Sequence, residues 1–271
     1  MAHRSALINV MVSAVFKAAR GLNRDFGEVE QLQVSRKGPA DFVSTADTKA
    51  ERTLFQELSR ARPEVGFLME ERGAIEGKDK TKRWIVDPLD GTTNYLHGLP
   101  HWAVSVGFEE RGEIMAAVIY DPAKDEMFWS EKGRGAYVDD KRLRVSSRQN
   151  LNESLLATGI PWQGRSGHAE SQAEIAAFAP RVAGIRRYGA ASLDLAYVAA
   201  GRFDGFWEAG LSAWDIAAGI LLVREAGGMI TEIDQGSRML ETGSVLATNT
   251  NLHDDMARVI REARKELKSK S

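Results

Sequence analysis

The residues best suited to chemistry lie in one segment, Trp84-Ile-Val-Asp-Pro-Leu-Asp-Gly-Thr-Thr-Asn-Tyr95. Its first apolar residues predict a buried strand that runs into Asp87. Pro88 locks the backbone and is expected to stop the strand at this point. Asp90 follows three positions after Asp87, so the two carboxylates can face the same point. Magnesium takes oxygen ligands in octahedral geometry, and this pair could supply two of them.

The residues beside the two aspartates suit a phosphate ester as well as a metal ion. The backbone carbonyl of Leu89, between the aspartates, could be a third oxygen ligand. Gly91 and Thr92 leave backbone N–H groups for a phosphate, provided that a helical turn begins there. A structural alternative stays open, because Asp-x-x-Asp-Gly is also typical of a surface turn.

Two other acidic positions could join this segment. Glu70-Glu71 follows a short apolar run, and Asp215 begins an apolar stretch that is expected to be helical. The glutamate pair could instead be an exposed acidic turn, and Ser212-x-x-Asp215 has the form of a helix capping box. If the carboxylates converge, they would suit phosphoryl transfer, because bound metal ions neutralise the phosphate and lower the pKa of water.

The elements that must position these residues differ between the two parts of the chain. Apolar residues at helical spacing predict helices at 5–23 and 45–60. Short apolar runs separated by turn residues predict an antiparallel meander, with strands at 84–87, 103–108, 114–120 and 126–130.

From about residue 144 onward, strands and helices alternate, which predicts an α/β layer. The expected strands are 155–158, 185–187, 205–208, 229–233 and 245–248, and the expected helices are 169–178, 192–200 and 215–226. We therefore expect an N-terminal α+β domain (1–141) with an antiparallel sheet and a C-terminal α/β domain (142–271) that contributes Asp215.

Composition narrows the class of protein. The chain has 271 residues, 43% hydrophobic and 27% charged, which is ordinary for a globular protein. The net charge of -2 gives no support for a nucleic-acid or membrane partner. The absence of cysteine excludes disulfides and thiolate metal sites and fits a cytoplasmic protein. No apolar run approaches the roughly 18 residues that a membrane helix needs, and the N-terminal apolar residues have helical spacing rather than the pattern of a signal peptide.

Taken together, these segments resemble the inositol monophosphatase family. The matching stretches follow one another in the family's order: Asp41-Phe-Val-Ser-Thr-Ala-Asp47, Glu70-Glu71, the aspartate segment, Gly189-Ala-Ala191, Phe206-Trp-Glu208, Trp214-Asp215 and Glu225-Ala-Gly-Gly228. The aspartate segment is highly specific for the family. Residues 192–205 look most like its bacterial branch of extragenic suppressor proteins.

The resemblance implies an α+β / α/β layered sandwich (αβαβα), as in inositol monophosphatase and fructose-bisphosphatase, with the active site between the two halves. It implies two or three Mg²⁺ ions, held by Glu70, Asp87, Asp90, Asp215 and the carbonyl of Leu89. It assigns Glu70, Thr92 and Asp47 to activating or positioning the attacking water. It places the substrate against Asp90, Gly91 and Thr92 on the phosphate side and against Gly189, Ala190, Ala191, Glu208 and Asp215 on the alcohol side.

The function implied by the resemblance is hydrolysis of inositol monophosphate, or a similar polyol or sugar phosphate, by metal-activated water. Lithium inhibition, a homodimer and a cytoplasmic location are also implied. Fructose bisphosphate, histidinol phosphate and a phosphorylated nucleotide remain alternative substrates, although Glu208 favours a polyol hydroxyl. A binding role with the transcription machinery is the alternative from a different class, because some bacterial relatives are associated with it.

Overall fold

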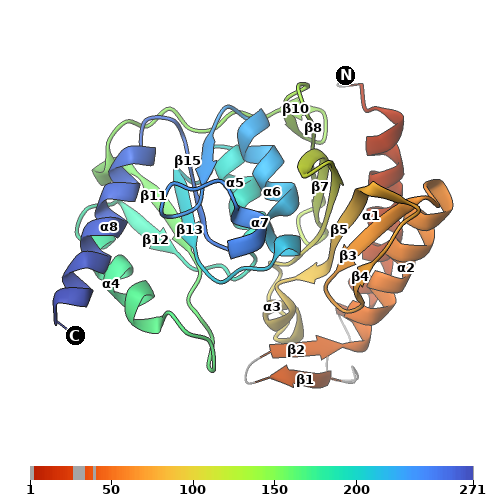
Figure 1. Cartoon of the computed structure of the whole chain (residues 1–271), viewed down its shortest axis with the longest axis horizontal. Helices are drawn as coiled ribbons and strands as arrows, with labels where there is room; N and C mark the ends of the chain where they lie inside the picture. The colour runs from red at the N-terminus through yellow and green to blue at the C-terminus, as the bar shows by residue number, and fades with distance from the viewer. Residues whose placement is uncertain (1–2, 27–33, 39–40, 271) are drawn as a thin grey trace.

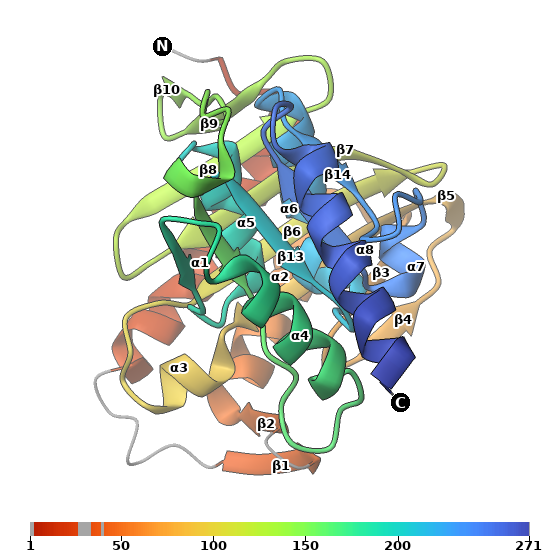
Figure 2. The same ribbon diagram turned by 90° about the vertical axis from the view of Figure 1, so that its left-hand side faces the viewer.

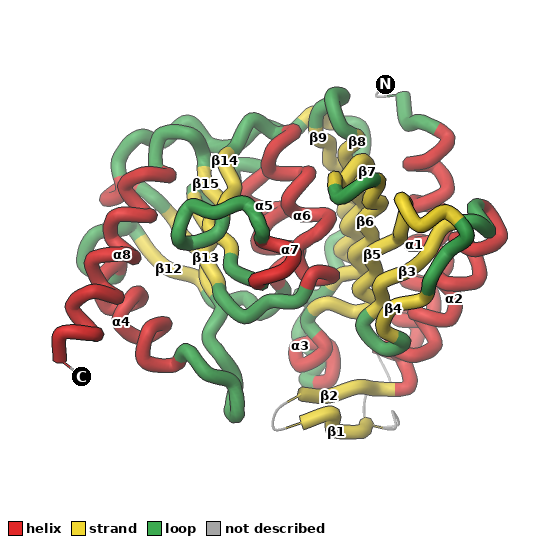
Figure 3. Tube along the Cα trace, viewed as in Figure 1, coloured by secondary structure: helices red, strands yellow, loops and turns green. Residues whose placement is uncertain are grey.

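The structure, a computed structural model, describes residues 3–26, 34–38 and 41–270. Its helices and sheets alternate as five layers (Figures 1 and 3). The first layer consists of α1 (Ala6–Phe26) and α2 (Thr45–Ala61). Both helices bury one apolar stripe against the first sheet, as the helical spacing of their apolar residues predicts.

The first sheet has eight strands in the order β10-β9-β8-β7-β6-β5-β3-β4. Its strands are β3 (Val65–Met69), β4 (Gly73–Ile75), β5 (Asp79–Asp90), β6 (Ala103–Glu110), β7 (Glu113–Asp121), β8 (Glu126–Glu131), β9 (Ala136–Val138) and β10 (Lys141–Arg142). From β5 to β10 each strand pairs antiparallel with the next, which confirms the predicted meander. Within the part of this sheet that the structure describes, β3 and β5 are the only neighbouring strands that run parallel.

One local prediction is wrong. Pro88 does not end its strand, because β5 continues to Asp90. The pairing with β6 shifts between Asp87 and Asp90, where Asp87 faces Ser105 and Asp90 faces Ala103. This β-bulge leaves an extra residue outside the ladder, so the missing N–H of proline costs no ladder hydrogen bond.

The second sheet has five strands in the order β12-β11-β13-β15-β14. Its strands are β11 (Leu155–Thr158), β12 (Gly184–Arg186), β13 (Gly205–Glu208), β14 (Met229–Thr231) and β15 (Val245–Thr248). On its outer face α4 (His168–Phe178) and α8 (His253–Lys270) lie side by side (Figure 2). The shorter elements are the β1–β2 hairpin (Val34–Gly38 and Asp41–Ser44), α3 (Thr92–Leu96), η2 (Leu151–Glu153) and α7 (Met239–Thr242).

The central layer consists of α5 (Ala191–Ala199) and α6 (Ala213–Glu225), between the two sheets. All residues of α5 are buried, including the polar Ser192 and Asp194, because the helix lies between the two sheets. A close approach of the two helices requires a small residue at Gly219, since an added Cβ would lie 2.4 Å from a methyl carbon of Leu195. The predicted αβαβα sandwich is therefore confirmed.

The two halves share this central layer. The boundary expected between residues 141 and 142 falls inside β10, and α6 packs against β7 of the first sheet. One core cluster contains Ile85 and Phe128 from the first half together with Phe206 and Ile216 from the second. The division into two domains stays a prediction. Within the ranges described above, no helix is long and apolar enough to cross a membrane.

Candidate active site

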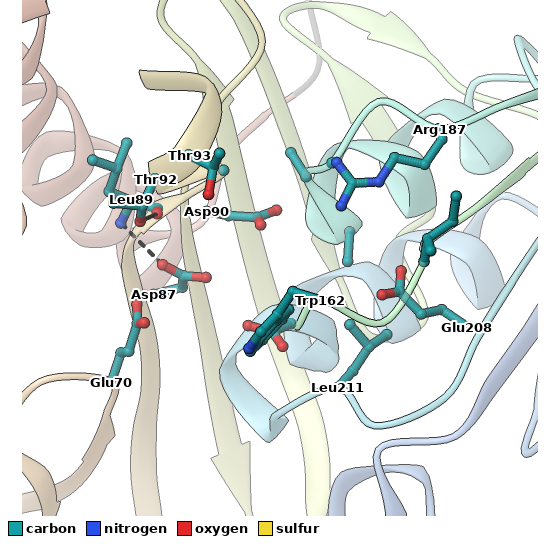
Figure 4. Close-up of a pocket in the computed structure, with 17 residues that line it drawn as sticks. Glu70, Asp87, Leu89, Asp90, Thr92, Thr93, Trp162, Arg187, Glu208 and Leu211 are labelled. Carbon is teal, nitrogen blue, oxygen red and sulfur yellow. Dashed lines mark hydrogen bonds between the residues drawn. The ribbon is translucent and has the colours of Figure 1, made fainter. Parts of the chain in front are cut away.

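A cleft between the two halves collects the predicted residues (Figure 4). Its empty volume is about 850 Å³, part of which is open solvent. The cleft lies beside the end of β5, the turn after β3 and the first turns of α5 and α6. Every residue predicted for the site lines it, with the exception of Asp47, which stands behind Thr92.

The β5 bulge fixes the two aspartates of the central segment. Asp87 is 2% exposed, and its Oδ1 accepts a hydrogen bond from the backbone N–H of Leu89 at 2.9 Å. This bond closes a tight turn around Pro88. Figure 4 shows Asp87 beside Glu70, with Asp90 farther along the cleft.

Asp90 connects the end of β5 to the start of α5. Its Oδ2 accepts a hydrogen bond from the backbone N–H of Ser192 at 2.8 Å and another from the Ser192 hydroxyl. Burial raises the pKa of Asp90 to about 6, although the hydrogen bonds from Ser192 oppose the shift. Ser192 was not predicted as a site residue.

Asp215 has both of the roles that the sequence left open, because it caps a helix and also lines the cleft. Its Oδ2 accepts a hydrogen bond from the backbone N–H of Ser212 at 2.7 Å, within a capping box at the start of α6. The same side chain lines the cleft. The capping bond uses one carboxylate oxygen, so capping α6 and facing the cleft are compatible.

The carboxylates repel one another across the cleft. Burial raises the pKa of Asp87 well above its ordinary value, and neighbouring charges raise it further, in the order Glu70, Asp90, Asp215. Burial likewise raises the pKa of Asp215, with Asp90 as the largest charged contributor. Such a group favours either protonation or a bound cation.

The donor set fits a hard divalent cation. It consists of carboxylates and one backbone carbonyl, which are the oxygen ligands that magnesium prefers. Among the residues that the structure describes, no three acidic or imidazole side chains are already gathered closely enough to hold an ion. Glu70, Asp87, Asp90 and Asp215 line the same cleft as the carbonyl of Leu89 and could hold such an ion there.

Thr92 and Asp47 lie within hydrogen-bonding distance of each other. Thr92 Oγ1 lies 3.1 Å from Asp47 Oδ1 and 3.0 Å from the carbonyl oxygen of Leu89. A hydroxyl has one proton, so it donates to one of these acceptors at a time. Asp47 is 1% exposed and belongs to the first turn of α2, which places the Thr92 hydroxyl at the cleft wall.

The opposite side of the cleft is formed by Gly189, Ala190, Ala191 and Glu208. The Gly189 loop is supported by Asn94, whose Nδ2 donates to the carbonyl oxygens of His101 and Tyr188 at 2.8 and 2.7 Å. Gly189 has a φ of +82°, which favours glycine.

Burial raises the pKa of Glu208 to about 7, while the positive charge of Arg187 opposes this shift. A carboxyl group that exchanges its proton near neutral pH can accept or donate a hydrogen bond to a hydroxyl group.

Several residues that line the cleft were not predicted, among them Arg187 and Trp162. In Figure 4 the Arg187 guanidinium and the Glu208 carboxylate face the same part of the cleft. Arg187 lies two residues before Gly189, a predicted site residue, and this position could have marked Arg187 as part of the site. Trp162 lies in the loop between β11 and α4, and nothing in its local sequence distinguishes it.

Comparison with known proteins shows which family the chain resembles. The model of the inositol monophosphatase family matches residues 3–266. The chain is 57% identical to an inositol-1-monophosphatase of Mesorhizobium japonicum, over 96% of this chain and 97% of that protein. It is 42% identical to the Nus factor SuhB of Pseudomonas aeruginosa, over 90% of this chain and 92% of that protein.

A solved structure has the same fold. The extragenic suppressor protein suhB from Bartonella henselae superposes with a TM-score of 0.92 at 53% identity, covering 94% of this chain and 98% of that chain. The family predicted from the motifs is thereby confirmed. From its match over nearly the whole length and from its shared fold, this chain belongs to the inositol monophosphatase family.

Proposed function

We propose that this chain is a magnesium-dependent phosphatase that hydrolyses inositol monophosphate, or a similar polyol phosphate, to the free alcohol and phosphate. The observation that carries the proposal is the set of mutually repelling carboxylates around one open cleft. The 57% identity to a protein named inositol-1-monophosphatase supports the same reaction and substrate class.

In this proposal the metal ligands are Glu70, Asp87, Asp90, Asp215 and the carbonyl of Leu89. Bound magnesium would neutralise the charge of the phosphate and lower the pKa of water. Asp90 and Asp215 each have one oxygen fixed by a backbone N–H, which restricts how the carboxylates can turn. The number of ions, two or three, stays a prediction.

The residues beside the ligands would orient the reacting groups. Asp47 orients the Thr92 hydroxyl, and this hydroxyl together with Glu70 would hold the attacking water. The phosphate would lie against the N–H groups of Gly91 and Thr92, where α3 begins. Water attacks phosphorus in line, the bond to the alcohol oxygen breaks, and the alcohol leaves with a proton from water.

The alcohol would occupy the side formed by Gly189, Ala190, Ala191 and Glu208, close to Asp215. Glu208 would accept a hydrogen bond from one hydroxyl of the alcohol, and Arg187 would donate to another oxygen. This pairing of an acceptor with a donor favours a polyol over an alcohol without further hydroxyls. Fructose bisphosphate, histidinol phosphate and a phosphorylated nucleotide remain the alternative substrates.

The experiment that tests the substrate class is phosphate release from a panel of phosphomonoesters, with Mg²⁺ and with added Li⁺. We expect release from inositol 1-phosphate and inhibition by Li⁺, with slower release from the phosphate of a simple alcohol. Activity on bisphosphates alone, without Li⁺ inhibition, would contradict the proposed substrate.

A second candidate function is binding to the transcription machinery, which the name Nus factor SuhB of the Pseudomonas relative supports. An Asp90→Asn variant separates the two functions, because binding should survive the loss of catalysis. Retention of transcription proteins by this variant in a pull-down supports the binding role, and loss of retention contradicts a binding role independent of catalysis. A homodimer and a cytoplasmic location stay predictions.

A further inference from the structure

A buried carboxylate outside the cleft, Glu51, holds the turn that carries Glu70. Glu51 belongs to α2 and is 1% exposed. Its Oε2 accepts a hydrogen bond from the backbone N–H of Glu71 at 2.7 Å, and its Oε1 lies 3.2 Å from Nε of Arg72. A buried charge needs such partners, and both of them lie in the turn between β3 and β4.

The bond from Glu51 restrains the backbone of Glu70 itself. Met69 ends β3 and pairs with Gly73, which begins β4, so the turn consists of residues 70–72. The N–H that Glu51 binds belongs to the peptide group joining Glu70 to Glu71. Fixing the plane of this peptide fixes ψ of Glu70, and with it the direction in which the Glu70 side chain leaves the backbone.

One face of α2 holds two turns that border the cleft, the turn that carries Glu70 and the turn that carries Thr92. Asp47 and Glu51 are four residues apart on the helix and therefore lie on one face. Asp47 accepts a hydrogen bond from Thr92, which follows β5, and Glu51 holds the turn that follows β3. Since β3 and β5 are paired neighbours, α2 fixes the Glu70 turn relative to the Thr92 turn.

We propose that Glu51 is a positioning residue that directs Glu70 into the cleft and thereby sets the affinity of the carboxylate site for a divalent cation. The proposal rests on the proposed function, in which Glu70 is a metal ligand. Groups that orient the ligands of a metal typically change its affinity about 10–100-fold when they are removed.

The test is calorimetric titration of Mg²⁺ into the full chain and four variants. Glu51→Ala removes the acceptor, and we expect the dissociation constant for Mg²⁺ to rise about tenfold or more. Glu51→Gln keeps an oxygen for the Glu71 N–H, so its affinity should stay within about threefold of the wild type. Glu51→Asp keeps the charge but is one methylene shorter, so it should bind as weakly as Glu51→Ala.

The matched control is Leu58→Ala, which removes a fully buried side chain of the same helix. It lowers the thermal stability without touching the turn, and its Mg²⁺ affinity should equal that of the wild type. If Glu51→Ala does not fold, Glu51→Gln and Glu51→Asp still test the proposal. If only the charge of Glu51 mattered, Mg²⁺ affinity would be preserved in Glu51→Asp and lost in Glu51→Gln.

Three results would overturn the inference. Wild-type affinity in Glu51→Ala or Glu51→Asp would show that the bond to Glu71 does not direct Glu70. Equal weakening in Leu58→Ala would show that only the stability of α2 matters. Absence of Mg²⁺ binding by the wild type would remove the proposed metal site itself, and this failure differs from the first two, in which the wild type still binds.

Discussion

Replacing Asp90 by Asn should show how much the partly buried charge of Asp90 destabilises the fold and how much it contributes to metal binding. The side-chain oxygen of Asn can still accept the N–H of Ser192, which lies 2.8 Å from Asp90 Oδ2. An aspartate with a raised pKa stabilises the fold below its unfolded-state pKa near 4 and loses that contribution as the pH rises through its folded-state pKa. For Asp90 the folded-state pKa is about 6, against an ordinary value of 3.8, so the loss is about 3 kcal/mol.

The assay is urea unfolding of both proteins without metal at pH 4 and pH 8. Between these two values the stability of the wild type should fall relative to Asp90→Asn by about 2–3 kcal/mol. At pH 8, Mg²⁺ at a hundred times its dissociation constant should then stabilise the wild type by about 2.7 kcal/mol and Asp90→Asn far less. At pH 4 the stabilisation of the wild type should shrink, because protons compete with the metal.

Two results would refute this reasoning. If the difference between the proteins does not change with pH, Asp90 is not a destabilised charge in the folded protein. If Mg²⁺ stabilises Asp90→Asn as much as the wild type, Asp90 is not a ligand.

Other positions give further predictions. Thr92→Val should lower kcat about hundredfold, because it removes the hydroxyl that Asp47 orients, and Thr92→Ser should keep most of the activity; steady-state kinetics checks both. Glu208→Gln and Arg187→Ala should each raise KM for inositol 1-phosphate about tenfold while KM for a simple alkyl phosphate stays unchanged. In a pH–rate profile at saturating Mg²⁺, kcat/KM should fall below about pH 7, because Glu208, with a pKa of about 7, becomes protonated and no longer accepts a hydrogen bond from the substrate.

Local patterns in the sequence predicted most of the helices and strands, whereas the order of the layers and the alcohol side of the cleft were implied by the resemblance to the family. Alternation of strands and helices after residue 144 predicted the second sheet, and the strands at 205–208 and 245–248 have the predicted bounds. Asp87 and Asp90 lie in one short segment, so their proximity followed from the chain itself. The bulge at Pro88 was not predicted, because it depends on how β5 pairs with β6.

Residues whose roles come from contacts between distant segments of the chain were not predicted from the sequence. Glu51 is followed by Arg52 in a charged helix, where a glutamate usually lies in solvent, yet the fold buries it against the Glu70 turn. Ser192 is likewise an ordinary helix residue until α5 meets the end of β5. Arg187 faces the cleft only because the loop after β12 returns to it.

Whether the carboxylates of the cleft hold a catalytic metal can be tested by the rate of phosphate release from inositol 1-phosphate as a function of Mg²⁺ concentration. The rate should be measured at pH 8 for the wild type and Asp87→Asn. We expect no release in a chelator, saturable activation of the wild type, and a loss of nearly all turnover in a folded Asp87→Asn protein. Release that persists in the chelator, or near-normal turnover of Asp87→Asn, would contradict the claim that the carboxylates of this cleft hold the catalytic metal.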